Sequence, residues 1–135
     1  MVKMTAIYKG EKHCTAKHEP SEALLETDAP KDNQGRGESF SPTDLVATAL
    51  GTCILTTMAI VAERDGVDIK GAKMSVEKVM NANPRTIGSL KTVIEMPAAV
   101  SPEYRHKLEL AANSCPVKKS LHPDVQIPVE FIYNL

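Results

Sequence analysis

The chain has 135 residues, a net charge of -1 and only 4% aromatic residues, with no tryptophan. A nearly neutral chain with few aromatic side chains lacks the basic footprint and the base-stacking platforms of nucleic-acid-binding proteins. Its three cysteines are too few for a disulfide scaffold, and the N-terminal residues do not resemble a signal peptide. We therefore expect a single domain over residues 1–135, in the reducing cytoplasm, with no nucleic-acid and no membrane partner.

The N-terminal part of the chain predicts three short strands followed by a loop. Strand-forming residues favour strands at residues 3–8, 13–19 and 23–27, separated by turn residues. Residues 28–39 are rich in Gly, Asp, Asn and Pro, which indicates a loop. A loop of this length in a small domain is usually functional or disordered, so this segment is a candidate for function.

A capped and uncharged helix is predicted at residues 41–66. Ser41 is placed as the N-cap, Asp44 can close a capping box, and Gly66 suits the left-handed conformation after the last turn. No residue from 45 to 62 is charged, so we expect this helix to be buried nearly all round. A membrane span is the rival interpretation, and small and polar residues within the run disfavour it. These residues are Thr48, Gly51, Thr52, Thr56 and Thr57.

The second half of the chain predicts two strands, two helices and a last strand. The strands are expected at residues 72–80 and 87–96, the helices at 101–113 and 115–121, and the last strand at 125–133. The resulting order, βββ-α-ββ-α-α-β, describes an α+β domain. One small sheet cannot cover the long apolar helix, which suggests that a second subunit covers the rest.

Cys115 has the local features of an activated thiol. Because Pro116 follows it, Cys115 is expected to be the N-cap of the short helix, facing the free amides of Val117 and Lys118. Lys118 and Lys119 add positive charge. Amides and cations of this kind lower a thiol pKa, so these features favour a thiolate at Cys115, although a cap that happens to be cysteine is also possible.

The other two cysteines carry weaker local signals. Cys53 lies in the middle of the long helix, where most free cysteines act as small buried hydrophobic residues. Cys14 lies in a predicted strand, and we regard it as incidental.

The segment Gly37-Glu38-Ser39-Phe40-Ser41-Pro42-Thr43-Asp44-Leu45, followed by Cys53 in the helix and Cys115-Pro116 before a terminal strand, resembles the OsmC family. That family includes osmotically inducible proteins and organic hydroperoxide resistance proteins. The resemblance covers essentially the whole chain. It implies an intertwined homodimer with the two long helices at its centre and two active sites at the subunit interface.

The resemblance also implies the chemistry: a thiol-dependent peroxidase that reduces organic hydroperoxides without a cofactor. Cys53 matches the attacking cysteine, which becomes a sulfenic acid, and Cys115 matches the cysteine that closes a Cys53–Cys115 disulfide. A dithiol electron donor then reduces the disulfide. The local features described above would instead make Cys115 the activated thiol.

The resemblance implies a cation for the helix thiolate, supplied by an arginine that a glutamate holds. In the hydroperoxide-resistance branch the glutamate falls ten residues before the helix cysteine, where this chain has Thr43. Arg36 and Glu38, on the loop before the helix, are the nearest substitutes in sequence. His18, on the second strand, is another candidate partner for the thiol, and a solvated role for each of the three is equally open.

Two other function classes remain as alternatives. A metal site could use Cys53, Cys115 and one histidine among His13, His18, His106 and His122, but no short Cys or His spacing supports it, so we expect no bound metal. A non-catalytic stress or binding protein could hold a small apolar ligand near Cys53. No Gly-x-Ser-x-Gly motif supports a serine hydrolase.

Overall fold

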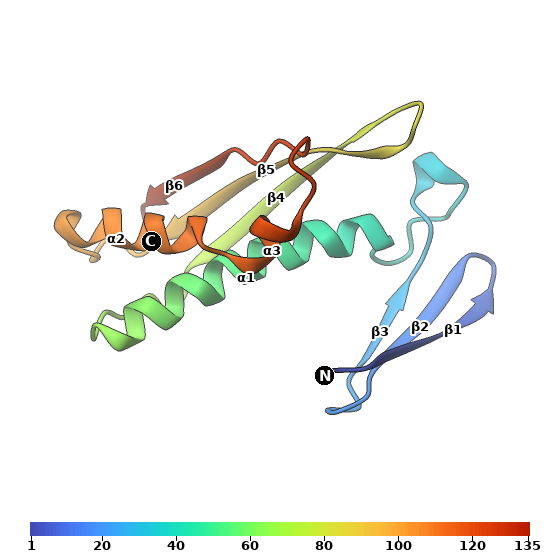
Figure 1. The fold of residues 1–135 in the computed structure, drawn as a ribbon, viewed down its shortest axis with the longest axis horizontal. Coiled ribbons are helices and arrows are strands. Elements are labelled where there is room, and N and C mark those ends of the chain that lie inside the picture. Colours follow the sequence, from blue (N-terminus) through green and yellow to red (C-terminus); the bar gives the residue numbers. More distant parts are fainter. The chain divides into compact units, whose positions relative to one another are not determined.

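The structure is a computed structural model that describes all 135 residues, in two compact units, Met1–Val46 and Ala47–Leu135. The elements follow one another in the predicted order, βββ-α-ββ-α-α-β, with one additional 3₁₀ turn in the first loop (Figure 1). The α+β class and every predicted helix and strand are therefore confirmed, with boundaries that differ by a few residues.

The first unit is built on a three-stranded antiparallel sheet in the order β1-β2-β3. β1 is Met4–Gly10, β2 is His13–His18 and β3 is Leu24–Thr27. The loop after β3 contains the 3₁₀ turn η1, Lys31–Asn33. Each strand pairs with the next one in sequence, so short turns suffice to connect them.

Backbone hydrogen bonds close the loop after β3 on itself. The amide of Asp28 donates to the carbonyl of Phe40 (3.1 Å), and the amide of Gly37 donates to the carbonyl of Ala29 (3.3 Å). Gly35 passes so close to Ala29 that an added Cβ would overlap the Ala29 carbonyl. The loop thus has a defined structure, and this structure accepts only glycine at position 35.

α1, Pro42–Arg64, begins and ends as its sequence predicts. The Asp44 amide donates to Ser41 Oγ (3.1 Å), and the Ser41 amide donates to Asp44 Oδ2 (2.9 Å), which is a complete capping box. At the other end Gly66 has a φ of 71°, in the left-handed region.

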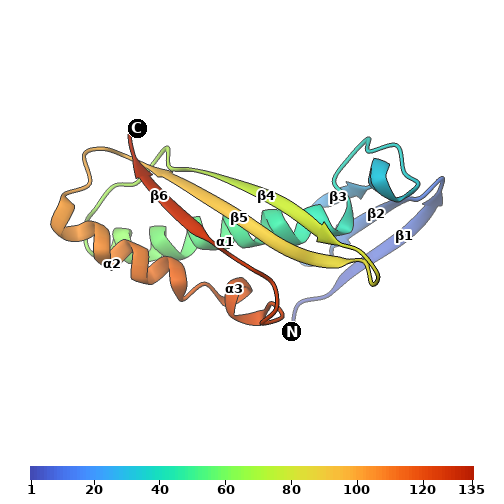
Figure 2. The ribbon, with the colours of Figure 1, turned by 90° about the horizontal axis from the view of Figure 1, so that it is seen from above.

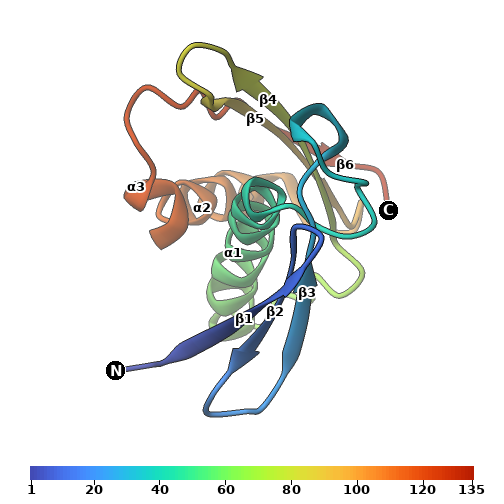
Figure 3. The ribbon, with the colours of Figure 1, turned by 90° about the vertical axis from the view of Figure 1, so that its right-hand side faces the viewer.

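The second unit contains a mixed sheet in the order β4-β5-β6. β4 and β5 are antiparallel, whereas β5 and β6 are parallel and need a crossover, which α2 and α3 supply. Figure 2 and Figure 3 show α1 and α2 on the same side of this sheet. The bounds are Lys73–Asn81 (β4), Thr86–Met96 (β5), Pro102–Asn113 (α2), Pro116–Ser120 (α3) and Val129–Tyr133 (β6).

The core of the second unit lies between α1 and the sheet. Leu50, Ile54 and Met58, spaced four residues apart on one face of α1, are completely buried. They belong to one cluster with buried residues of β5 and α2, among them Ile94 and Leu108. Because the helix period brings these side chains to one stripe, α1 packs against the sheet with a single face.

The expectation that α1 is buried nearly all round is wrong for a single chain. Its opposite face, with Ala49, Thr52, Thr56 and Ile60, is exposed, and Ile60 is 64% exposed. The hydroxyls of Thr52 and Thr56 donate to carbonyls one turn earlier, at 2.8 Å each, so this face presents mainly methyl groups. By length and composition alone α1 could also cross a membrane, a test that core helices of soluble proteins pass too.

A charged cluster fastens the C-terminal end of α1 to α2. Asp65 Oδ2 accepts hydrogen bonds from the ammonium of Lys107 (2.6 Å) and from the hydroxyl of Tyr104 (2.7 Å). The hydroxyl of Tyr104 also lies 3.3 Å from the carbonyl of Val61. The hydrogen bond from Lys107 and then that from Tyr104 lower the pKa of Asp65 to about 2.

Replacing Asp65 by Asn should lower the melting temperature by a few degrees at neutral pH, and the deficit should vanish in acid. The folded-state pKa lies below the ordinary value of 3.8, so the carboxylate stabilises the fold above pH 3.8 and loses this effect as the pH falls to about 2. Thermal melts from pH 7 to pH 2 measure the difference. Glu63→Gln, at the exposed end of the same helix, is the control, and a deficit independent of pH would contradict the prediction.

Candidate functional site

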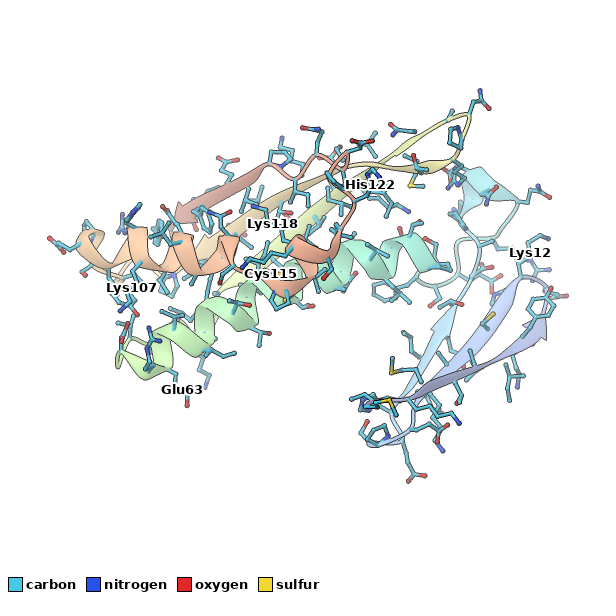
Figure 4. The ribbon with its side chains drawn as sticks, viewed as in Figure 1. Lys12, Glu63, Lys107, Cys115, Lys118 and His122 are labelled. Atoms are coloured by element: carbon cyan, nitrogen blue, oxygen red, sulfur yellow. The ribbon has the colours of Figure 1, made fainter.

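Cys53 and Cys115, 62 positions apart in the sequence, meet in the second unit. Cys53 projects from the middle of α1, and Cys115 is the N-cap of α3. Figure 4 shows Cys115 where α3 comes down onto α1. The two thiols are within hydrogen-bonding reach of each other, so the predicted proximity of the two sulfurs is confirmed.

The pKa of Cys53 is lowered below its ordinary value. Partial burial of its sulfur acts in the opposite direction, but three hydrogen bonds to the thiolate outweigh that effect. They come from the Cys115 thiol, the Val117 amide at the start of α3 and the Thr57 hydroxyl. Thr57 lies one helical turn after Cys53, with Oγ1 at 4.0 Å from Sγ. Cys53, the cysteine on α1, is therefore the thiol that ionises more readily.

The expectation of an activated thiol at Cys115 is wrong. Its sulfur does accept the Lys118 amide as a cap, at 3.5 Å, but Cys115 is completely buried. Burial, and then the hydrogen bond to Cys53, raise the pKa of Cys115. The ammonium of Lys118 also turns away from the sulfur and donates to Asn113 Oδ1 at 2.6 Å.

The two thiols therefore form a pair with distinct roles in proton chemistry. The two pKa shifts run in opposite directions, so Cys53 loses its proton before Cys115 as the pH rises. Cys53 is partly buried against the core cluster, whereas Cys115 is completely buried within it. A thiolate is the nucleophilic form of cysteine, so an electrophile from solvent meets Cys53 first, with a second thiol ready behind it.

Arg36 and Glu38 lie in the first unit, where they contact each other. Arg36 Nη1 is 3.5 Å from Glu38 Oε1 and 3.3 Å from Glu11 Oε2. Glu38 is half-exposed, and its other carboxylate oxygen faces His13 at 3.3 Å. The chain thus holds an arginine with glutamates, although not with the residue at position 43.

His18 and Cys14 also belong to the first unit. His18 Nδ1 and the hydroxyl of Ser21 are 2.6 Å apart, and the Ser21 amide donates to the same nitrogen at 3.3 Å, so the ring braces the turn between β2 and β3. Cys14 is paired across the sheet with Tyr8 and Thr27.

Sequence reasoning missed three features of the sites. The Val117 amide, expected to face Cys115, does so and also reaches Cys53, because α3 approaches α1. Thr57 was recognisable only from its four-residue spacing to Cys53 on a helix. The third feature is a group of His13, Asp28 and Glu38, arranged like metal ligands. This group contains neither cysteine, unlike the metal site that the sequence analysis kept as an alternative.

An open hollow lies beside the C-terminal half of α1. Leu55, Thr56 and Ala59 form its helical wall, and the segment from Gly66 to Ala72 forms the other. Neither Cys53 nor Cys115 lines this hollow. It is continuous with the exposed face of α1 through Thr56.

Comparison with known proteins gives a family match over most of the chain. The family model for OsmC-like protein matches residues 35–130. A crystal structure from Psychrobacter arcticus 273-4, named for an osmotic stress induced and detoxification response, is 39% identical. It covers 97% of this chain and 96% of its own, with a TM-score of 0.92.

More distant proteins share the fold. An organic hydroperoxide resistance protein from Legionella pneumophila is 16% identical, covers 98% of this chain and 96% of its own, and has a TM-score of 0.74. YmaD of Bacillus subtilis, an uncharacterised protein, is 24% identical over 136 residues, which are 94% of this chain and 90% of YmaD. The likeness to the Legionella protein establishes the fold alone.

Proposed function

The chain belongs to the OsmC-like protein family, and on this premise we propose that it is a two-cysteine peroxidase that reduces organic hydroperoxides with electrons from a dithiol donor. The observation that carries the proposal is the pair of Cys53 and Cys115, in which the partly buried Cys53 has a lowered pKa and the completely buried Cys115 has a raised pKa. Such an order of ionisation suits a peroxidatic and a resolving cysteine.

In the proposed reaction the Cys53 thiolate attacks the outer oxygen of the hydroperoxide. The O–O bond breaks, the alkoxide takes a proton and leaves as alcohol, and Cys53 becomes a sulfenic acid. The Cys115 thiol then displaces the sulfenic hydroxyl, which leaves as water, and a Cys53–Cys115 disulfide forms. The dithiol donor reduces this disulfide by two successive thiol exchanges and becomes a disulfide itself.

The surroundings of the pair favour an organic peroxide over hydrogen peroxide. Val117 and Leu121 of the α3 segment are partly buried hydrophobic residues packed against the same core cluster as the cysteines. An alkyl or aryl group gains from contact with such side chains, whereas hydrogen peroxide does not. Relatives named as organic hydroperoxide resistance proteins are consistent with this choice.

The proposal includes a homodimer in which α1 of one chain covers α1 of the other. The exposed face of α1 carries small residues, with Ala49 and Thr52 near its middle, which permits close approach of a second helix. An apolar face of this kind is seldom left open in a soluble protein. The open hollow beside it adds further surface for a partner chain.

Arg36, held by Glu38, is proposed as the cation at the Cys53 thiolate in the assembled protein. Replacing Arg36 by Ala should then raise the pKa of Cys53 and slow its reaction with peroxide about tenfold. Stability should change by less than roughly 0.5 kcal/mol, because the side chain is 61% exposed. Thiol alkylation against pH measures the effect. Lys31→Ala, on the same loop, is the control, and unchanged reactivity of the Arg36 variant would move the role to His18.

Stopped-flow consumption of an alkyl hydroperoxide and of hydrogen peroxide tests the function, with several dithiol donors in turn. We expect faster loss of the alkyl hydroperoxide and loss of two thiols per chain, with Cys14 still reactive. The alternative is a non-catalytic protein that binds a small apolar ligand in this region. Peroxide consumption no faster than that of a free thiol would favour this alternative.

A further inference from the structure

Three side chains from separate segments of the first unit meet at the base of the loop after β3. His13 begins β2, Asp28 directly follows β3, and Glu38 lies near the end of the loop. His13 Nε2 is 3.6 Å from Asp28 Oδ2 and 3.3 Å from Glu38 Oε2. The three possible ligand atoms all lie within 4.8 Å of one another.

The ring of His13 is oriented as in metal-binding histidines. Its Nδ1 lies 2.7 Å from the carbonyl of Glu11, a contact in which the nitrogen donates its proton. This bond leaves Nε2 as the nitrogen that faces the two carboxylates. A histidine that ligates a metal generally donates its other N–H to a carbonyl or carboxylate in this way, which fixes both tautomer and ring orientation.

Asp28 supplies an independent sign of a ligand site. Its side chain is completely buried, and Oδ2 accepts the amide of Glu38 at 3.0 Å. Oδ1 is also buried and has no hydrogen-bond partner. The amides of Ala29 and Arg36 also approach the carboxylate and, after the Glu38 amide and the charge of His13, help to lower the pKa of Asp28. A buried carboxylate oxygen without a partner is costly, and a cation held by both oxygens of Asp28 would satisfy Oδ1 while Oδ2 faces His13.

The spacing fits a metal ion better than a shared proton. Charge-assisted N–H···O bonds are about 2.7–2.9 Å long, shorter than both distances from His13 Nε2. Two ligands about 2.0–2.1 Å from a tetrahedral zinc ion are roughly 3.3 Å apart, close to the observed distances. The second oxygen of Glu38 faces Arg36, so the arginine does not occupy the position between the three ligands.

We propose that His13, Asp28 and Glu38 bind a divalent transition-metal ion of the zinc class. One imidazole nitrogen and two carboxylate oxygens make a mixed set that suits such ions better than Mg²⁺ or Ca²⁺, which prefer oxygen ligands alone. The half-exposed Glu38 leaves an approach from solvent, where water completes the coordination. The bound ion joins β2 to both ends of the loop, and none of its proposed ligands is a cysteine.

Zinc titration of the reduced full-length protein against a competing chelator tests the proposal. We expect one Zn²⁺ per chain and more than about tenfold weaker binding in His13→Gln and in Glu38→Gln. Glu38→Gln is expected to fold normally, because Glu38 is half-exposed, so weaker zinc binding in this variant reports the loss of a ligand. His106→Gln, an exposed histidine of α2, is the matched control. The Cys53→Ser/Cys115→Ser double variant should retain the site.

X-ray absorption at the zinc edge separates this site from binding by thiols. The proposal requires a first shell of nitrogen and oxygen at about 2.0–2.2 Å, whereas a cysteine site shows sulfur at about 2.3 Å. A sulfur shell, zinc binding that only the double cysteine variant loses, or no binding at micromolar zinc would each overturn the proposal. Equal affinity in wild type and Glu38→Gln would remove Glu38 from the ligand set and would overturn the three-ligand site.

Discussion

Replacing Cys53 by Ser should abolish peroxide reduction, with a loss of about 10³-fold or more in rate, because a serine hydroxyl does not ionise in place of the thiolate. The Cys53 thiol is the one with the lowered pKa, and α1 contains no other cysteine that can replace it. Single-turnover peroxide consumption measures the loss. Cys14→Ser, which removes a cysteine of the first unit, should react like the wild type.

Replacing Cys115 by Ser should separate the two chemical steps. The first turnover should proceed, and Cys53 should then remain as a sulfenic acid that a dimedone probe labels, because the resolving thiol is gone. The opposite pattern, with full activity in Cys53→Ser and none in Cys115→Ser, would reverse the two roles. If neither replacement matters, the chain keeps the family fold without this chemistry, and the absent glutamate at position 43 becomes the first suspect.

Arginine at both Thr52 and Thr56 should convert the proposed dimer into monomers. Both threonines are exposed in the single chain and lie on the apolar face of α1. In a dimer packed through this face, two unpaired charges would be buried at a cost of several kcal/mol. Sedimentation velocity at micromolar concentration measures the mass, and circular dichroism checks that the monomer remains folded.

Thr86→Arg, at the exposed start of β5, is the matched control and should leave the dimer intact. A wild-type protein that sediments as a stable, folded monomer would contradict the dimer itself. A double-arginine variant that remains dimeric would instead place the interface elsewhere on the chain.

The sequence predicted the ends of helices and strands well where neighbouring residues determine them. The capping box of Ser41 and Asp44 and the left-handed Gly66 set both ends of α1 where the sequence places them. The last strand begins at Val129 and not at residue 125, because Pro128 has no amide to donate to the ladder. Residue 126 contributes only an isolated bridge to Ser89.

The site depended on contacts that no local pattern encodes. The resemblance predicted that Cys53 and Cys115 meet, but the lowered pKa was expected at the wrong sulfur, because burial of Cys115 is a property of the packed core. Likewise, the uncharged run from residue 45 to 62 indicates that α1 must be covered. It does not indicate whether the same chain or a second chain covers it. The cluster of His13, Asp28 and Glu38 joins residues from three segments whose spacing matches no known motif.

The pairing of one thiolate with one thiol fixes the proton stoichiometry of the proposed oxidation. Starting from ionised Cys53 and protonated Cys115, formation of the disulfide and the alcohol leaves one hydroxide, so each chain takes up one proton from the medium. Starting from two protonated thiols, the same oxidation yields water and takes up none. A weakly buffered solution that starts above the pKa of Cys53 should therefore gain one equivalent of base per disulfide, and this equivalent should disappear as the starting pH falls through that pKa.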